Sequence, residues 1–136
     1  MIYLDTSVVL PLLVIDSHSR TAEQRVAGAD DLVVSHWTGA EVAAVLQCKG
    51  RERAINAALA AMALDAYRQL TQDIVRVVAL DGNDGPETIE FVRRLELKLR
   101  APDALHLAIC RRVGAALLTF DDNQAAAAAV LGVALA

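Results

Sequence analysis

Short apolar runs and longer helix-forming stretches alternate along the whole chain. Each apolar run is bounded by polar residues or glycine, a pattern that predicts a buried β-strand. The expected strands cover residues 1–4, 32–34, 74–80, 115–120 and 133–135. The stretches between them are amphipathic, or rich in alanine without helix breakers, which favours helices. The expected helices cover residues 7–15, 20–26, 40–47, 53–71, 86–99, 102–113 and 123–131.

This order of elements predicts an α/β fold. Strands that alternate with helices form parallel sheets covered by helices, so we expect an α/β sandwich with a parallel sheet of about five strands. The chain has 136 residues, of which 55% are apolar, and it contains no polar linker. This size and composition predict one domain over residues 1–136 with a sizeable hydrophobic core.

Four acidic residues occupy places where a parallel sheet brings ligands together. Asp5 directly follows the first strand, and Asp121 follows the fourth. Asp103 opens the helix before the fourth strand, and Glu41 lies near the first turn of the helix after the second strand. Ligands of open α/β sheets bind at the carboxyl ends of the strands. We therefore expect the four carboxylates to converge in one cleft.

Four carboxylates in one cleft repel one another unless protons or a cation compensate their charge. A hard divalent cation such as Mg²⁺ or Mn²⁺ prefers oxygen ligands of this kind. The histidines and cysteines do not form a zinc-ligand pattern, and Cys48 and Cys110 are far apart in the sequence. The acids therefore predict a Mg²⁺ or Mn²⁺ site.

The net charge of −4 argues against attachment to nucleic acid through the overall charge of the protein. Binding of nucleic acid would therefore depend on a local group of basic residues. Lys49, Arg51 and Arg53 lie just beyond the helix that carries Glu41, and they are candidate contacts for the phosphates of an RNA. The alternative interpretation is a solvated helix end.

Charged residues interrupt every apolar stretch well before the roughly 18 residues that a membrane-spanning helix needs. The first five residues also lack the basic start of a signal peptide. We expect a cytoplasmic protein that does not associate with membranes.

Two other classes of acid-bearing α/β protein fit the sequence less well. A phosphate-signalling receiver domain needs a lysine beyond its late strands, but no lysine follows Lys98. A phosphohydrolase with an aspartate nucleophile needs a second aspartate two residues after the first, and Ser7 occupies that position.

Four motifs surround the acids in order along the chain: YLDTS with Asp5, SHWTGAEVAAVL with Glu41, APDALHLA with Asp103, and LLTFDD with Asp121. With these motifs the chain resembles the PIN-domain ribonucleases, and it is most similar to the VapC-type toxins of bacterial toxin–antitoxin pairs. The resemblance extends from the first residues to near the end of the chain.

The resemblance implies a PIN-like three-layer sandwich and an endoribonuclease that cleaves RNA with Mg²⁺ or Mn²⁺. The family's catalytic and metal-binding acids correspond to Asp5, Glu41, Asp103 and Asp121. The resemblance also implies a homodimer that a cognate antitoxin protein holds inactive. The alternative function is a catalytically silent PIN-fold module that retains antitoxin or RNA binding, and the presence of all four acids argues against it.

Several residues near the expected cleft have two interpretations each. Asp122 adjoins Asp121, and we favour Asp121 as the fourth acid. Ser7 and Thr119 are candidate accessory residues that hold water near the metal, although helix capping and strand preference also explain them. His106 follows Asp103 by three residues and either packs structurally or contacts substrate.

Two apolar features suggest contacts with partners. Trp37 is either a core or interface residue or a platform for stacking a base. Residues 8–15 form an almost wholly apolar segment, which suits self-association and an amphipathic partner helix laid in a groove, or else a buried core helix. We expect such a partner to place a guanidinium group among the acids, where it competes with the metal.

Overall fold

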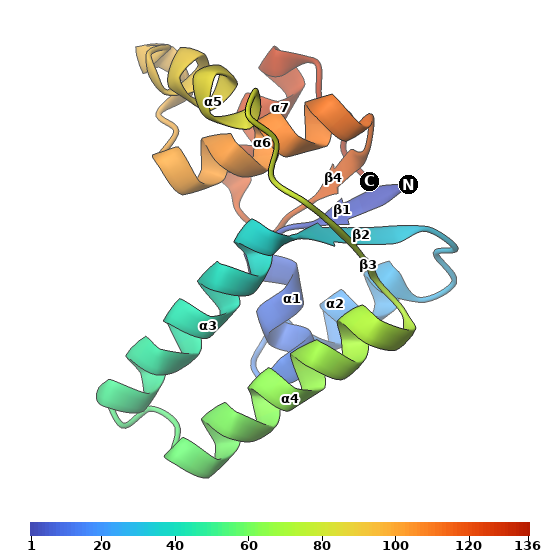
Figure 1. Cartoon of the computed structure of the whole chain (residues 1–136), viewed down its shortest axis with the longest axis vertical. Helices are drawn as coiled ribbons and strands as arrows, with labels where there is room; N and C mark the ends of the chain where they lie inside the picture. Colours follow the sequence, from blue (N-terminus) through green and yellow to red (C-terminus); the bar gives the residue numbers. More distant parts are fainter.

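The computed structural model describes residues 1–136 and contains a four-stranded sheet. The strands are β1 (Ile2–Leu4), β2 (Leu32–Ser35), β3 (Arg76–Val78) and β4 (Ala116–Leu118), and they lie in the order β3-β2-β1-β4 (Figure 1). Every pair of neighbouring strands is parallel. The predicted parallel α/β fold is therefore confirmed.

The fifth predicted strand is reduced to a single bridge beside β4. Leu135 pairs with Leu117 in a parallel bridge. The backbone N–H of Leu117 donates to the carbonyl oxygen of Ala134 (2.7 Å), and the N–H of Ala136 donates to the carbonyl oxygen of Leu117 (2.9 Å). The end of the chain thus covers one edge of the sheet without forming a regular strand.

The two-residue period of the strands divides the core between the two faces of the sheet. Tyr3, Val33 and Leu117 belong to one buried cluster, and Leu4 and Leu118 belong to another. Tyr3 stands beside both Val33 and Leu117 in the register of the sheet, so these side chains share one face. Since both faces are buried, the strands read as continuous apolar runs.

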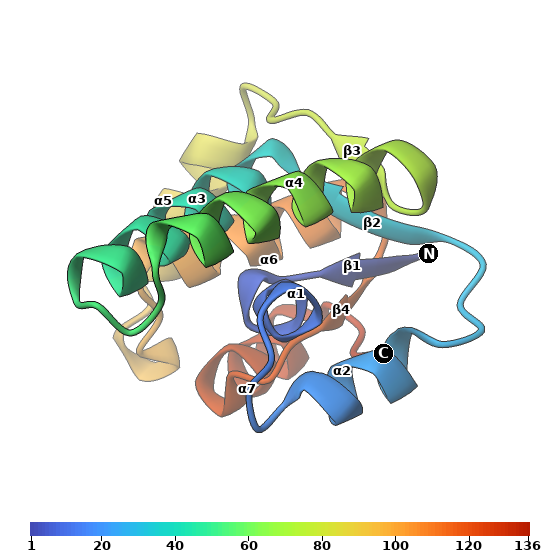
Figure 2. The same cartoon turned by 90° about the horizontal axis from the view of Figure 1, so that it is seen from below.

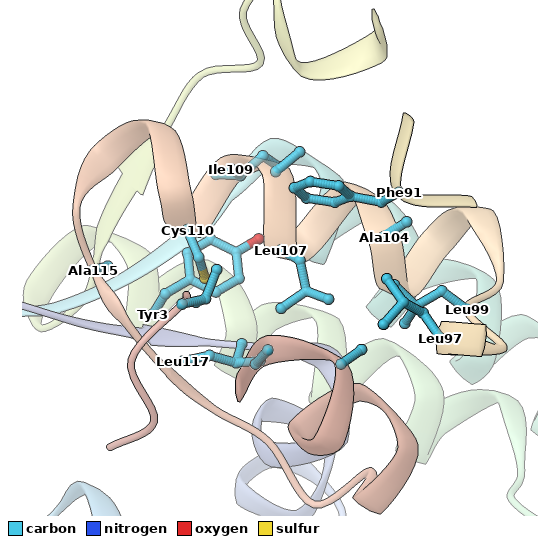
Figure 3. Close-up of a cluster of buried hydrophobic side chains, with 14 of the residues drawn as sticks. Tyr3, Phe91, Leu97, Leu99, Ala104, Leu107, Ile109, Cys110, Ala115 and Leu117 are labelled. Atoms are coloured by element: carbon cyan, nitrogen blue, oxygen red, sulfur yellow. The ribbon is translucent and has the colours of Figure 1, made fainter. Parts of the chain in front are cut away.

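Helices cover both faces and produce three layers. The first face carries α5 (Asp84–Val92), α6 (Ala101–Val113) and α7 (Asp122–Leu131). Figure 3 shows Phe91 of α5 and Leu107 of α6 in the cluster on this face. The other face carries four helices: α1 (Thr6–Leu13), α2 (Ser19–Val26), α3 (His36–Arg51) and α4 (Ala57–Asp73). Figure 2 shows α1 nearly end-on, with α3 and α4 on one side of it and α2 on the other.

The loop predicted over residues 35–39 is wrong, because β2 runs directly into α3. Ser35 caps this helix: its hydroxyl accepts from the backbone N–H of Thr38 (3.2 Å). The hydroxyl of Thr38 in turn accepts from the backbone N–H of Ser35 (3.2 Å). This reciprocal capping box satisfies both backbone donors, and it lets the helix start without a connecting loop.

The helix predicted over residues 86–99 ends early. α5 stops at Val92, and a 3₁₀ turn, η1 (Leu95–Leu97), follows it. Lys98 then adopts a left-handed conformation (φ 51°). This break turns Leu97 and Leu99 into the core, where both are buried. The burial of these two leucines explains why an amphipathic pattern continues beyond the helix.

Other boundaries differ by a few residues from the sequence-based expectation. α4 begins at Ala57, after Asn56 caps it, and not at residue 53. β3 and β4 are shorter at both ends than the predicted runs. None of the helices combines the length and apolar composition needed to cross a bilayer.

Candidate active site

The four predicted acids come from four different elements near the carboxyl ends of the strands. Asp5 follows β1 and caps α1, while Asp121 lies beyond β4 and caps α7. Asp103 lies in the first turn of α6. Glu41 is the sixth residue of α3 and so lies in its second turn, not near its first turn as predicted, because α3 starts directly after β2.

Electrostatic coupling indicates that three of these carboxylates share one region. Burial raises the pKa of Asp103, and the negative charge of Asp121 raises it further. The charge of Glu41 acts in the same direction, while His106 partly opposes it. The ionised form of Asp103 is therefore disfavoured by its acidic neighbours, as expected where carboxylates converge.

Asp5 is the most deeply buried of the acids, with an exposed fraction of 5%. Its Oδ1 accepts hydrogen bonds from the hydroxyl of Ser7 (2.6 Å) and from the backbone N–H groups of Ser7 (2.8 Å) and Val8 (3.3 Å). Its Oδ2 accepts from the hydroxyl of Thr119 (2.9 Å). Burial raises the pKa of Asp5, although these hydrogen bonds and the nearby His106 counteract part of the effect.

The hydroxyls of Ser7 and Thr119 connect Asp5 to the chain after β4. The Ser7 hydroxyl accepts from the backbone N–H of Phe120 (2.8 Å), and the Thr119 hydroxyl accepts from that of Asp121 (3.0 Å). Each hydroxyl also donates to Asp5. Both residues therefore fix the position of Asp5 relative to Asp121, which is a more direct role than capping or strand preference.

Glu41 belongs to a partly buried chain of hydrogen bonds that sequence reasoning missed. Its Oε2 lies 2.6 Å from Nε2 of His106 and accepts from the hydroxyl of Thr6 (2.5 Å). Nδ1 of His106 lies 2.7 Å from the hydroxyl of Tyr3. Burial raises the pKa of Glu41, but the hydrogen bonds from His106 and Thr6 outweigh burial, so the net shift is downward.

The geometry of His106 defines the roles of its two ring nitrogens. The exposed fraction of His106 is 2%, so the ring has no access to bulk water. A carboxylate only accepts, so Nε2 donates to Glu41, and in the neutral ring Nδ1 accepts from Tyr3. Ser35 and Thr38 surround the same Tyr3 hydroxyl at 2.7 and 3.2 Å. The available sequence signal was Tyr3, a polar tip within an apolar strand.

Asp121, and not its neighbour Asp122, is tied to the other acids. Oδ1 of Asp121 accepts from the backbone N–H of Gln124 (2.8 Å), which caps α7. The fully buried Gln124 donates through Nε2 to the backbone oxygen of Asp103 (3.3 Å). Asp121 is also the acidic neighbour whose charge raises the pKa of Asp103 most. This placement supports the choice of Asp121 as the fourth acid.

The acids do not yet form a single coordination sphere in this arrangement. No three His, Cys, Asp or Glu side chains stand together in a way that could hold one ion. Asp5, Glu41 and Asp121 each turn a carboxylate oxygen toward protein donors. The donor chemistry nevertheless fits a hard divalent cation, because all four acids offer carboxylate oxygens. Burial disfavours the ionised forms of Asp5 and Asp103, and the positive charge of a cation would favour those forms.

The structure separates the three basic residues predicted to contact RNA. Lys49 lines a cavity of about 330 Å³ together with Ser7 and Asp121 of the acid cluster. Arg51 lines a different cavity between α3 and α4. Arg53 is exposed in the turn after α3 and has a positive φ of 57°. Only Lys49 therefore shares a cavity with residues of the candidate active site.

Trp37 lies at the start of α3 and packs against the hydrophobic core. Its half-buried ring lines an apolar cavity of about 510 Å³ together with Ile89 of α5 and Leu105 of α6. Its Nε1 is buried without a hydrogen-bond partner. This environment fits the predicted core or interface role better than base stacking.

Comparisons with solved structures support the fold. The VapC20 toxin of Mycobacterium tuberculosis, described as cleaving the sarcin-ricin loop, aligns with a TM-score of 0.73 and 22% identity over 93% of this chain and 95% of its own. FitAcB from Neisseria gonorrhoeae aligns with a TM-score of 0.69 and 17% identity over 99% of this chain and 96% of its own. A chain of a toxin–antitoxin complex from Klebsiella pneumoniae aligns with a TM-score of 0.62 and 17% identity over 89% of this chain and 87% of its own.

The family comparison agrees with the structural one. A comparison with curated proteins gives no significant match. The sequence profile of the PIN domain, in contrast, matches residues 2–130, which include all four acids. The chain therefore belongs to the PIN domain family.

Proposed function

We propose that this chain is a divalent-metal-dependent endoribonuclease that hydrolyses RNA phosphodiester bonds and acts as the toxin of a VapC-type toxin–antitoxin pair. The observation that carries the proposal is the placement of Asp5, Glu41, Asp103 and Asp121 by four separate elements near one edge of the sheet. A stability role does not account for this placement, because it raises the pKa values of Asp5 and Asp103.

In this proposal Asp5, Asp103, Asp121 and Glu41 hold Mg²⁺ or Mn²⁺ after local rotation of their side chains. When bound, such a cation neutralises charge that develops on the phosphate and increases the acidity of water. Ser7 and Thr119 keep Asp5 in place through their hydroxyls. A nucleophilic serine or cysteine is not required.

Glu41 has the properties of a group that orients water. Its lowered pKa keeps it ionised near neutral pH. Both of its hydrogen bonds end on Oε2, so Oε1 remains available to accept a hydrogen bond from an attacking water. His106 and Thr6 thereby fix the side chain without occupying the second oxygen.

The proposed antitoxin is a small protein with an amphipathic helix and a basic side chain. The structural neighbours described as toxins or toxin–antitoxin complexes support this class of partner. The chain itself offers a groove of about 290 Å³ between α1 and α4, lined by Leu12, Leu13, Leu70 and Ile74. Ile74 is 69% exposed, which suits an apolar partner. We also propose a homodimer and a cytoplasmic site of action, where RNA is available.

The decisive experiment is cleavage of a total RNA preparation by the purified protein, followed by sequencing of the new RNA ends. We expect discrete ends with Mg²⁺ or Mn²⁺ and none with EDTA or with Asp103→Asn. Metal-independent ends that persist in Asp103→Asn would contradict the assignment. Absence of cleavage together with retained RNA or antitoxin binding would favour the silent binding module.

The regulatory half of the proposal needs a separate test. We expect the protein to co-purify with the product of an adjacent small reading frame and to lose cleavage activity in that complex. Replacing the arginines of that partner should restore cleavage, because a guanidinium group competes with the metal for carboxylates. An active monomer that is indifferent to this neighbour would refute the toxin assignment while leaving the nuclease assignment intact.

A further inference from the structure

A cavity beside the candidate active site is lined in part by residues other than the four acids. The cavity of about 330 Å³ is lined by Ser7 and Asp121 and also by His18, Lys49 and Phe120. The Ser7 hydroxyl bonds both Asp5 and the backbone of Phe120. The cavity therefore adjoins the residues that hold Asp5 in place.

Lys49 supplies the only permanent positive charge in this cavity. The other titratable groups that line it are Asp16, His18 and Asp121. Lys49 makes no salt bridge in the structure, although it lines the same cavity as Asp16 and Asp121. An unpaired ammonium group beside a nuclease site is suited to a phosphate of the substrate.

An aromatic pair lies beside this charge. The rings of His18 and Phe120 are stacked, with their centroids 5.4 Å apart and an angle of 25° between the planes. Phe120 directly precedes Asp121, so the pair stands next to an acid of the site. Flat rings of this kind bind single-stranded nucleic acid by stacking on its bases.

The loop that carries His18 is fixed by its own hydrogen bonds. The backbone N–H of His18 donates to Oδ1 of Asp16 (2.7 Å), and the N–H of Asp16 donates to the hydroxyl of Ser19 (2.9 Å). That hydroxyl donates to the carbonyl oxygen of Pro11 in α1 (2.7 Å). The loop is therefore tied to the helix that Asp5 caps, and His18 is presented to the cavity in a defined position.

We propose that this cavity is a subsite for one nucleotide of single-stranded RNA adjacent to the cleaved bond. Its phosphate binds Lys49, and its base stacks on the His18–Phe120 pair. The inference rests on the proposed ribonuclease function and deepens it by assigning two substrate-binding elements, Lys49 and the His18–Phe120 pair, within one cavity. It also distinguishes Lys49 from Arg51, which follows two residues later but faces another cavity.

The test measures binding of a fluorescently labelled, sequence-randomised short RNA to the Asp103→Asn protein in EDTA, where cleavage is absent. We compare Lys49→Gln, His18→Ala and the matched control Arg51→Gln in this background. Lys49→Gln should weaken binding about tenfold and reduce the slope of log Kd against log salt by about 0.7, the value for one phosphate contact on a single strand. His18→Ala should weaken binding about fivefold without changing that slope.

Each outcome separates the subsite from the proposed catalytic function. Equal losses in Lys49→Gln and Arg51→Gln, or unchanged binding in both Lys49→Gln and His18→Ala, would overturn the subsite even if the wild-type protein cleaves RNA. Selective loss in Lys49→Gln and His18→Ala would support it even if cleavage fails. Tighter binding of duplex than of single-stranded RNA would also overturn it, because paired bases cannot stack on the aromatic pair.

Discussion

Nε2 of His106 lies 2.6 Å from Oε2 of Glu41, although 65 residues separate the two in the sequence. The same imidazole is held from its other side by the Tyr3 hydroxyl at 2.7 Å. The catalytic candidate Glu41 is therefore oriented by a buried residue that belongs to a different layer of the fold. His106 is a positioning residue in this arrangement, since it acts on Glu41 and not on the substrate.

Replacing His106 should therefore impair cleavage without removing any acid. We expect His106→Leu to lower kcat by about 10- to 100-fold, the usual effect of losing a group that orients a ligand. His106→Gln retains a donor and should recover part of the activity, and Tyr3→Phe should show a smaller loss. The measurement is the RNA cleavage rate, with circular dichroism as the control for folding. Full activity in a folded His106→Leu protein would contradict the positioning role.

Asp103→Asn should separate catalysis from stability. We expect loss of metal-dependent cleavage and, in the absence of metal, a gain on the order of 1 kcal/mol in the free energy of unfolding. The gain follows because burial and the charges of Asp121 and Glu41 disfavour the ionised carboxylate. Urea denaturation in EDTA measures the change. Addition of MgCl₂ should raise the melting temperature of the wild-type protein more than that of Asp103→Asn. An equal rise in both proteins would argue against Asp103 as a metal ligand.

The stability of the metal-free protein should depend on pH through the same carboxylates. The folded-state pKa values of Asp5 and Asp103 are raised, so the folded chain binds more protons than the unfolded chain between the two values. Their unfavourable contribution is present above the folded pKa and disappears as the pH falls toward the unfolded value of about 4. The lowered pKa of Glu41 acts in the opposite sense, because its stabilisation is lost as the pH falls through its folded pKa.

The difference between Asp103→Asn and wild type isolates one of these contributions. We expect the extra stability of the variant to be largest near neutral pH and to shrink as the pH falls through the folded pKa of Asp103. Urea unfolding of both proteins in a chelating buffer at several pH values gives this difference. A difference in the free energy of unfolding that grows toward acidic pH would show that the ionised carboxylate of Asp103 does not destabilise the folded state.

The sequence predicted the backbone of this site better than its side-chain contacts. Strand ends and helix starts are local features, so the elements that carry Asp5, Asp103 and Asp121 could be predicted from apolar runs, a proline and polar boundaries. Burial of both sheet faces likewise followed from continuous apolar strands. The position of Glu41 was wrong by about one turn, because the capping box of Ser35 removed the expected loop.

The contacts of His106 could not be predicted, because they join three distant segments. No local pattern indicates that Nδ1 of His106 meets Tyr3 and that Nε2 meets Glu41. The end of α5 was missed for a similar reason, since Leu97 and Leu99 enter the core by a turn that follows no helical period. Long-range packing decides both features.

Two adjacent arginines attach α6 to α5. Arg112 forms two hydrogen bonds with Asp84, at 2.7 and 3.0 Å, and a third with the backbone oxygen of Ala79 at 2.8 Å. Asp84 is only 2% exposed. Arg111 pairs with Glu87 and lies over the ring of Phe91 at 4.7 Å, but both charged partners of this pair are more exposed.

The burial of the acid should decide which arginine matters. Arg112→Met leaves the buried Asp84 carboxylate without its partner and should cost about 3 kcal/mol, whereas the matched control Arg111→Met should cost about 1 kcal/mol. Urea unfolding curves of the two variants test this difference. The double variant Asp84→Asn, Arg112→Met removes both charges and should recover part of the loss, because the desolvation cost of Asp84 disappears with its charge. Equal costs for the two single variants would show that the attachment of α5 depends on arginine packing and not on the buried ion pair.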